Sequence, residues 1–438
     1  MKPMPKKNDT ASVFGLGRSG RALVTHLVRA GVRVYAFDDA PREALGDTPL
    51  WLSSLGVPLF AGGKGEARGD FVFRTPAMRP DHKALCRAAL RGAVVMGEAE
   101  YFATLCPCPI LAVTGSDGKT TTSSMLAGLL TASGKRVYLG GNIGKSLLPF
   151  LDEMRKDDLC VLELSSFQLL DMECKFHTGV VTNLTPNHLN WHRSLAEYES
   201  AKRRLSLLSE RRVLRVGLFD EMEALRFSAQ TDADFTVKDG VIYGLSLPLM
   251  RVSDVRVEGQ HNLENLLAAA AAAAPYATPA ALRRFARAFG GAPHRMELVA
   301  VKEGVRYVNS SIDTTPSRTA ATLAAQRKNG RLLVLLGGRG KCLSYEPLCD
   351  ALASSDTKAF LFGEAEEEMA CALSVRGLPY LRCGRMENAF DSAEREAATG
   401  DTVLLSPAAT SYDAFLDFEE RGNLFRTLVN QKGNTEKG

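Results

Sequence analysis

The stretch Ile110-Leu-Ala-Val-Thr-Gly-Ser-Asp-Gly-Lys-Thr120 decides the fold of this 438-residue chain. Its apolar half predicts a buried strand over 109–114, and a glycine loop then leads into a helix from Lys119. Backbone N–H groups of such a loop converge on phosphate oxygens, and the helix N-terminus adds positive potential. We therefore predict a triphosphate site, with Lys119 on the β- and γ-phosphates and the Thr120 hydroxyl on Mg²⁺.

The match to the general P-loop spacing is incomplete, because Val113 stands where the first glycine should be. A glycine turn with a surface lysine is the plainer interpretation. The strand–loop–helix context favours phosphate binding. The predicted phosphate contacts are Gly115, Ser116, Asp117, Gly118, Lys119, Thr120 and Thr121.

Short β-rich runs alternate with helical stretches along the whole chain, which predicts α/β domains with mostly parallel sheets. Cys106-Pro-Cys-Pro109 has the composition of a linker, and Gly290-Gly-Ala-Pro293 opens a further block. We expect three domains, over residues 1–97, 98–291 and 292–438.

Two further glycine loops are candidate ligand sites. Gly15-Leu-Gly-Arg-Ser-Gly20 fits the dinucleotide fingerprint, with Asp38 at the end of the next strand. Alone it is compatible with NAD, with another nucleotide diphosphate or with a structural turn. Gly140-Gly-Asn-Ile-Gly144 permits close backbone approach, and Asn142 within it is able to bond a ligand oxygen.

Three polar side chains near the predicted ATP loop are weak signals when taken singly. Glu163 ends an apolar strand, where a carboxylate is well placed to bind Mg²⁺, although a buried acid paired with a lysine has the same pattern. His188 ends another strand and is compatible with a structural role. Lys202 lies on a predicted helix that Ser194-Leu-Ala-Glu197 should open, and helix lysines are usually solvated.

Composition restricts the class of protein. The formal net charge is +4, and no basic run is interleaved with aromatic residues, so we expect no nucleic-acid partner. The nine cysteines are scattered, which indicates reduced thiols. The first residues lack the apolar core of a secretory signal and no apolar run is long enough to span a bilayer, so we expect a cytoplasmic protein.

Taken in order along the chain, several motifs resemble those of the Mur ligases of peptidoglycan synthesis. In the central block these are the Gly115–Thr120 loop, the Gly140–Gly144 loop, Glu163-Leu-Ser-Ser-Phe-Gln-Leu169 and Asn187-His-Leu-Asn-Trp-His192. The third of them resembles the D-glutamate-adding branch of the family. Later motifs agree: Gln260-His-Asn262, Pro293-His-Arg295, Leu336-Gly-Gly-Arg-Gly-Lys341, Leu405-Ser-Pro-Ala-Ala-Thr-Ser411 and Phe418-Glu-Glu-Arg-Gly-Asn423.

The resemblance implies a Rossmann-like first domain for the UDP-sugar, a central P-loop-type ATPase domain, and a Rossmann-like third domain that binds the amino acid and closes over the site. It also implies a reaction in the synthesis of peptidoglycan precursors, which serves cell shape and division. ATP phosphorylates the alanyl carboxylate of UDP-MurNAc-L-Ala, and the amine of D-glutamate then attacks the acyl phosphate. The products are an amide, ADP and phosphate. ATP is thus a co-substrate, two Mg²⁺ ions are the implied cofactors, and a monomer working on small molecules is the implied assembly.

The resemblance also carries roles onto individual residues. Lys119, Glu163, His188 and Lys202 are the implied catalytic residues, and Thr120, Glu163, His188 and a carbamylated Lys202 the implied metal ligands. Asn262 and Arg295 match ATP contacts. The UDP-sugar contacts are Arg18, Ser19, Gly20, Asp38, Asp39 and Asn142, and the D-glutamate contacts are Thr314, Lys341, Ser411, Tyr412 and Phe418.

The chain departs from the family pattern at Asn309-Ser-Ser-Ile-Asp-Thr314, where many relatives have Asn-Asp-Ser-Lys-Ala-Thr. Ser310 replaces an acid that helps to hold the nucleotide, and Ile312 replaces a lysine. Asp313 is one candidate substitute for that acid. Smaller departures are Asp117 for a frequent Asn, Asn187 for an Asp of some relatives, and Tyr412 for a Leu.

Three alternatives stay open at the level of sequence. The first is another Mur-type or folylpolyglutamate-type ligase, which shares the ATPase core. The second is an NAD-dependent oxidoreductase built on the loop Gly15–Gly20, which leaves the central block unexplained. The third is a non-catalytic nucleotide-binding descendant of a ligase.

Overall fold

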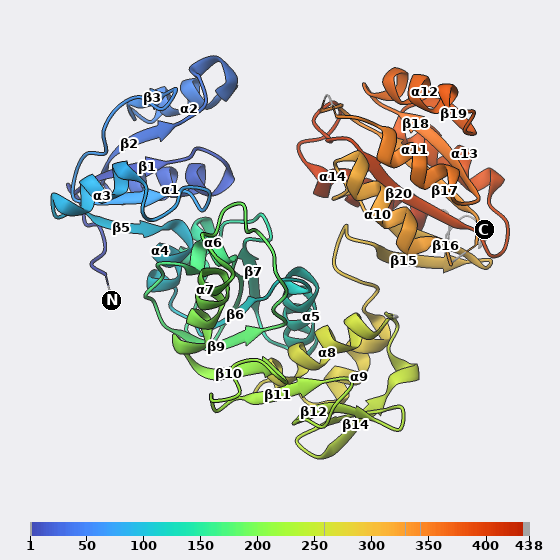
Figure 1. Cartoon of the computed structure of the whole chain (residues 1–438), viewed down its shortest axis with the longest axis horizontal. Coiled ribbons are helices and arrows are strands. Elements are labelled where there is room, and N and C mark those ends of the chain that lie inside the picture. Colours follow the sequence, from blue (N-terminus) through green and yellow to red (C-terminus); the bar gives the residue numbers. More distant parts are fainter. Residues whose placement is uncertain (1, 258, 329, 342, 432–438) are drawn as a thin grey trace. The chain divides into compact units, whose positions relative to one another are not determined.

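The structure is a computed structural model that describes residues 2–257, 259–328, 330–341 and 343–431. Contacts divide it into two compact units, Met1–Phe289 and Gly290–Gly438, which are described separately (Figure 1). Within the described ranges, no helix is both long enough and apolar enough to cross a membrane.

The first unit begins with a five-stranded parallel sheet. Its order is β3-β2-β1-β4-β5. The strands are β1 (Thr10–Phe14), β2 (Arg33–Asp38), β3 (Leu59–Ala61), β4 (Phe71–Arg74) and β5 (Val94–Gly97). The chain leaves β1 toward β2 on one side and returns to β4 on the other, so a topological switch point lies beyond the end of β1. Helix α1 (Arg18–Arg29) follows at that point and buries Leu23, Val24 and Leu27.

The second sheet of this unit has nine strands in the order β14-β13-β12-β11-β10-β9-β6-β8-β7. Its parallel part consists of β6 (Ile110–Thr114), β7 (Val137–Gly141), β8 (Leu159–Glu163), β9 (Phe176–Val181), β10 (Ser209–Arg215), β11 (Leu225–Ser228) and β12 (Phe235–Lys238). The strands β13 (Val241–Gly244) and β14 (Leu247–Arg251) extend it in antiparallel fashion. Strand β6 is buried on both faces, as its continuous apolar sequence predicts.

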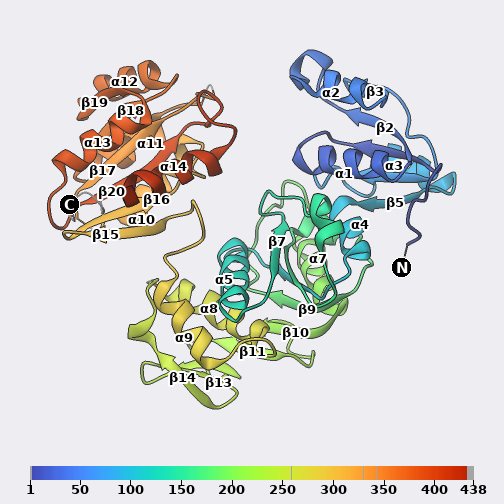
Figure 2. The same ribbon diagram turned by 180° about the vertical axis from the view of Figure 1, so that it is seen from behind.

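Helices cover both faces of this second sheet (Figures 1 and 2). Apolar side chains of α5 (Lys119–Ala132), α8 (Gln260–Ala273) and α9 (Pro279–Ala288) form one core with the sheet. On the other face, residues of α4 (Glu98–Leu105), α6 (Ser166–Leu169) and α7 (Leu195–Leu207) belong to a core that also includes the first sheet. This shared core makes one compact unit of the two sheets, and their predicted division after residue 97 stays a prediction.

The second unit is built on a six-stranded sheet in the order β15-β16-β20-β17-β18-β19. The strands are β15 (Glu297–Lys302), β16 (Val305–Asn309), β17 (Leu332–Gly337), β18 (Thr357–Phe362), β19 (Tyr380–Gly384) and β20 (Thr402–Ala408), all parallel except for β15. One face is covered by α10 (Pro316–Gln326), α11 (Glu346–Ala353) and α12 (Glu366–Val375). The other is covered by α13 (Met386–Glu396) and α14 (Phe418–Gln431).

The predicted α/β class with mostly parallel sheets is confirmed. The Ser194 side chain accepts a hydrogen bond from the N–H of Glu197, as the capping prediction requires. The Glu197 carboxylate does not complete the box, because it binds Arg79 instead. Sequence reasoning did not single out the antiparallel strands β13 and β14.

Candidate active site

The predicted phosphate-binding loop lies at the carboxyl end of β6, which pairs in the sheet with β8 on one side and β9 on the other. Two of its glycines are required by their surroundings. A Cβ on Gly115 would lie 1.8 Å from the Thr182 hydroxyl, and one on Gly118 would lie 2.3 Å from Asn265 Oδ1. Gly118 also has a φ of 76°, in the left-handed region that favours glycine.

Residues just after β9 hold the loop in shape. The Thr182 hydroxyl donates to the Asp117 carbonyl over 2.6 Å, and Asn183 Oδ1 accepts from the Asp117 N–H over 2.8 Å. The Ser116 hydroxyl donates to the Thr185 carbonyl and lies 2.7 Å from the Tyr198 hydroxyl. These bonds fix the loop backbone before any ligand arrives, which is the preorganisation that phosphate binding needs.

Two lysines converge on one carbonyl of the loop. Lys119 Nζ donates to the carbonyls of Gly115 (2.9 Å) and Ser116 (2.8 Å). Lys202 Nζ, on α7, donates to the same Gly115 carbonyl over 2.6 Å. Lys202 is buried, so it is not the solvated helix lysine of the plainer interpretation. Burial, reinforced by the charge of Lys119, lowers the pKa of Lys202 to about 7.

Glu163 is the described residue best suited to hold a cation. Its side chain is 1% exposed, and Oε1 accepts a hydrogen bond from Asn142 Nδ2 over 2.8 Å. Oε2 is buried without a hydrogen-bond partner among the described residues. An unpartnered carboxylate oxygen is costly in a protein interior, and a divalent cation would satisfy it. The residues present therefore fit Mg²⁺.

His188 lies on the exposed loop after β9, with a φ of 55°. Burial lowers its pKa, and the nearby charges of Lys119 and Lys202 lower it further. Its ring packs edge-on against Phe167, with the two ring centres 5.1 Å apart. Over the described residues, no three His, Cys, Asp or Glu side chains come together as a metal cluster.

The Gly15–Gly20 loop is closed by its own backbone contacts. A Cβ on Gly20 would lie 1.9 Å from the Gly15 carbonyl oxygen, so this position accepts only glycine. The Asp38 carboxylate accepts hydrogen bonds from the N–H groups of Leu16 and Ala40 and thereby shapes the loop. Arg18 is exposed at the start of α1 and lies close to Gly144, so the two glycine loops approach each other.

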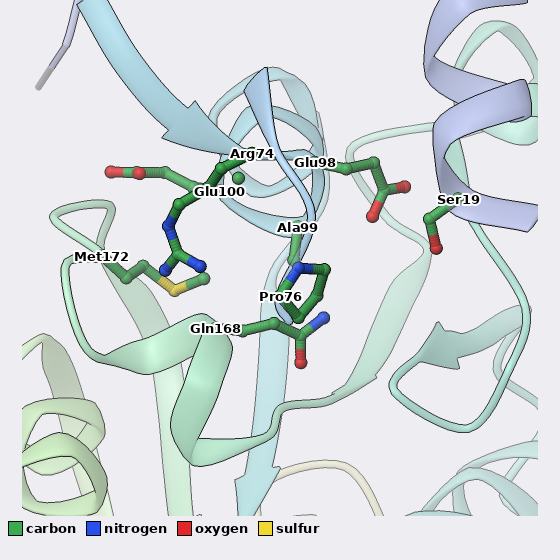
Figure 3. A pocket seen from close by; sticks show the side chains of 9 residues that line it. Ser19, Arg74, Pro76, Glu98, Ala99, Glu100, Gln168 and Met172 are labelled. Atoms are coloured by element: carbon green, nitrogen blue, oxygen red, sulfur yellow. The ribbon is translucent and has the colours of Figure 1, made fainter. Parts of the chain in front are cut away.

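A pocket lies beside these loops (Figure 3). Ser19 and Glu98 point their polar ends into it, and Gln168 of α6 lines another side. The Ser146 hydroxyl donates to Glu98 Oε1 over 2.5 Å, and burial raises the pKa of Glu98 to about 7. The sequence analysis missed Glu98, whose only local signal is an acid in the first turn of a helix.

In the second unit, two of the predicted amino-acid contacts come together. Lys341 Nζ donates to the Thr314 hydroxyl over 3.1 Å. Burial and the charge of Arg318 lower the pKa of Lys341. Ser411 is buried and Tyr412 is 56% exposed. Phe418 begins α14, and its carbonyl accepts a hydrogen bond from the Ser311 hydroxyl.

At residues 309–314 the sequence departs from the family pattern, and two of the departing side chains, Ser310 and Asp313, make internal hydrogen bonds within this unit. Ser310 is fully buried, and its hydroxyl accepts from the Met296 N–H over 3.2 Å. Asp313 points inward, where its carboxylate accepts hydrogen bonds of 2.8 Å from the hydroxyls of Thr322 and Ser406. Burial raises its pKa. A carboxylate held this way is not available to a nucleotide, so the candidate substitution of Asp313 for the missing acid is wrong.

One residue that supports the loop and one that braces the neighbouring segment around Trp191 had no visible signal in the sequence. Asn265 touches Gly118 and accepts from the Thr122 hydroxyl over 3.1 Å, one turn beyond the predicted ATP contact Asn262 on the same helix. Arg79 belongs to the segment after β4, yet it binds Glu197 of α7 and the Trp191 carbonyl. Both contacts join segments more than 100 residues apart, which no local pattern indicates.

A preorganised glycine loop at the edge of a parallel sheet, with lysines and an unpartnered carboxylate around it, defines a nucleotide-phosphate-binding α/β protein. The comparisons narrow this class. The family model for the Mur ligase middle domain matches residues 113–273, and that for the Mur ligase glutamate ligase domain matches residues 294–409. The chain belongs to the Mur ligase family, and it is an ATP-dependent ligase.

Among curated proteins, the chain is 36% identical to the UDP-N-acetylmuramoylalanine–D-glutamate ligase of Ruminiclostridium cellulolyticum, with 97% of each chain covered. It is 37% identical to the ligase of the same name from Symbiobacterium thermophilum, over 97% of this chain and 98% of that one. The fold is similar to the crystal structure of UDP-N-acetylmuramate-alanine ligase from Thermotoga maritima. The TM-score is 0.54 at 19% identity, over 97% of this chain and 100% of that one.

Proposed function

We propose that this ligase joins D-glutamate to UDP-N-acetylmuramoyl-L-alanine in the synthesis of peptidoglycan precursors. The observation that carries the proposal is the convergence of Lys119 and Lys202 on the Gly115 carbonyl beside a preorganised phosphate loop. Similarity to D-glutamate ligases over 97% of the chain supports the choice of substrate.

The chemistry explains why ATP is needed. A carboxylate resists attack by an amine because its leaving group would be an oxide. Transfer of the γ-phosphoryl group to the alanyl carboxylate gives an acyl phosphate and ADP. The amine of D-glutamate then attacks the acyl carbon, phosphate leaves, and the amine gives up a proton as the amide forms. The work of the protein is positioning and charge neutralisation.

The side chains around the loop divide this work. Lys119 neutralises the transferring phosphoryl group, while the loop N–H groups bind its oxygens. Glu163, Thr120 and His188 are the residues that would hold Mg²⁺, which supplies further charge neutralisation when bound. Asn142 orients the Glu163 carboxylate through its 2.8 Å hydrogen bond.

We propose that Lys202 acts as a carbamate. Carbamylation requires a neutral amine, and burial has lowered the pKa of Lys202 to about 7. A buried neutral amine would gain an anionic oxygen ligand by adding carbon dioxide, which explains a lysine so close to the loop. The geometry that supports the carbamate is the burial of the Lys202 side chain and its 2.6 Å hydrogen bond to the Gly115 carbonyl, which place the amine beside the loop.

The remaining assignments are proposals as well. Arg18, Ser19, Gly20, Asp38 and Asp39 would bind the UDP-sugar, Asn262 and Arg295 would bind ATP, and Lys341 with Thr314 would bind a carboxylate of D-glutamate. The pairing of Lys341 with Thr314 supports the last of these. Cytoplasmic localisation, a monomeric state and a second Mg²⁺ stay predictions.

The test is phosphate release from ATP with UDP-N-acetylmuramoyl-L-alanine, scanned over candidate amino acids. We expect turnover with D-glutamate and none with L-glutamate, L-alanine or meso-diaminopimelate. Preference for one of the others would assign the chain to a different branch of the family. Binding of NADH without ATP turnover would overturn the proposal.

A further inference from the structure

Two cysteine thiols meet at the amino end of strand β6, opposite the phosphate loop. Cys106 caps the C-terminus of α4, Cys108 is separated from β6 by one residue, and a third cysteine, Cys160, lies on the neighbouring strand β8. The sulfur atoms of Cys106 and Cys108 are 3.5 Å apart. Cys106 Sγ also lies 3.9 Å from Met154 Sδ. The proposed ligase reaction uses none of these groups.

The three thiols differ in their access to solvent. Cys106 is half-buried, and the intervening Pro107 is exposed. Cys108 is 6% exposed and Cys160 is fully buried. A small reagent can therefore reach Cys106. The Cys108 sulfur is buried and lies 3.5 Å from the Cys106 sulfur.

The thiols also differ in acidity. Either sulfur can donate in the contact between Cys106 and Cys108, and the Cys106 thiol also lies 3.6 Å from the Cys108 carbonyl oxygen. The contact with Cys108 lowers the pKa of Cys106. The same bond to Cys106, together with burial, raises the pKa of Cys108. A half-buried sulfur with a second, buried sulfur 3.5 Å away is the arrangement in which one sulfur attacks and the other resolves.

We propose that Cys106 and Cys108 form a dithiol site for exchange with low-molecular-weight disulfides. The Cys106 thiolate attacks one sulfur of the disulfide, forms a mixed disulfide and expels a thiolate. Cys108 then loses its proton to that thiolate and attacks Cys106 Sγ, expelling the second thiolate. Overall, the protein dithiol is oxidised to the Cys106–Cys108 disulfide, and the small disulfide is reduced to two thiols.

The site is separate from the nucleotide chemistry. Strand β6 runs from Ile110 to Thr114, and at about 3.3 Å per residue its length separates Cys108 from the glycine loop. The exchange can therefore be tested whether or not the proposed ligase reaction is correct.

The experiment treats the folded full-length protein with oxidised glutathione near neutral pH, followed by alkylation and peptide mass mapping. The tryptic peptide from Gly92 to Lys119 contains Cys106 and Cys108 and no other cysteine. We expect this peptide to lose two hydrogens and to retain no glutathione. The Cys108→Ser variant should instead trap one glutathione on Cys106, and Cys106→Ser should leave the peptide unmodified.

Cys86→Ser is the matched control, because Cys86 is an exposed cysteine on another helix of the same unit. It should not alter the oxidation of the Gly92–Lys119 peptide. Three results would overturn the proposal: a fully alkylated peptide in the wild type, a stable glutathione adduct on wild-type Cys106, or a cross-link to the peptide that carries Cys160. The wild-type map decides the matter even if a serine variant fails to fold.

Discussion

Lys202 Nζ lies 2.6 Å from the carbonyl oxygen of Gly115, the first residue of the phosphate-binding loop. Lys119 donates to the same carbonyl over 2.9 Å. Two cationic side chains that share one acceptor repel each other, and this is part of the reason why the pKa of the buried Lys202 is lowered. The Gly115 carbonyl oxygen thus accepts hydrogen bonds from a lysine of α5 and from a lysine of α7.

The substitution Lys119→Ala should abolish acyl phosphate formation, with phosphate release reduced roughly 100-fold or more, because a preorganised charge on the phosphoryl group is lost. Binding of the UDP-sugar, measured by calorimetry, should change little. Lys135→Ala, at an exposed position just after α5, is the control and should retain activity. Near-normal phosphate release by Lys119→Ala would refute the P-loop assignment.

The substitution Lys202→Ala should remove most activity, and short carboxylic acids such as acetate should restore part of it. The reason is that the small acid would occupy the space of the carbamate and supply its oxygen ligand. Phosphate release measured over a range of acetate concentrations checks this. The Lys119→Ala variant, treated identically, should show no rescue. A Lys202→Ala variant that stays inactive at every acetate concentration would argue against the carbamate.

The substitution Arg79→Ala should destabilise the first unit by about 1–3 kcal/mol, because it breaks a charge-assisted pair with Glu197 and leaves the Trp191 carbonyl unpaired. Urea unfolding followed by circular dichroism measures the loss, because removal of the Arg79 guanidinium from the Trp191 ring would itself change the tryptophan fluorescence. Arg87→Ala, which removes an exposed pair with Glu66, should cost no more than about 1 kcal/mol. Equal effects of the two substitutions would contradict the bridging role of Arg79.

His294 should make the second unit less stable in mild acid. Burial lowers its pKa from 6.5 to about 4, and its Nδ1 pairs with the Asn309 amide over 3.0 Å. The unfolded chain therefore binds more protons between those values, and stability should fall as the pH drops from 6.5 toward 4, by up to about 3 kcal/mol.

The substitution His294→Asn tests this dependence, because asparagine tolerates the φ of 59° at this position. The urea midpoint of the variant should fall less between pH 7 and pH 5 than that of the wild type. The exposed His261→Asn should keep the wild-type dependence. In the wild type, the histidine NMR resonance that the variant lacks should titrate well below pH 6.5; titration near 6.5 would contradict the burial argument.

The local sequence determined the elements that carry the site. The apolar run 109–114, the glycines at 115 and 118 and the helix from Lys119 were predicted correctly, because strand burial, turn geometry and helix initiation depend on neighbouring residues. The Ser194 cap was predicted for the same reason. The family followed from the order of motifs along the chain.

Only the tertiary structure decided which side chains brace or occupy the site. Thr182 and Asn183 hold Asp117 from 65 or more residues away, Arg79 reaches Glu197, and Asp313 turns inward to Ser406. The tertiary structure likewise shows that the first two sheets share a core within one compact unit. Which distant residues form hydrogen bonds, and which side chains become buried, depends on the order of the strands in each sheet. That order is set by the packing of the whole chain and not by any single segment.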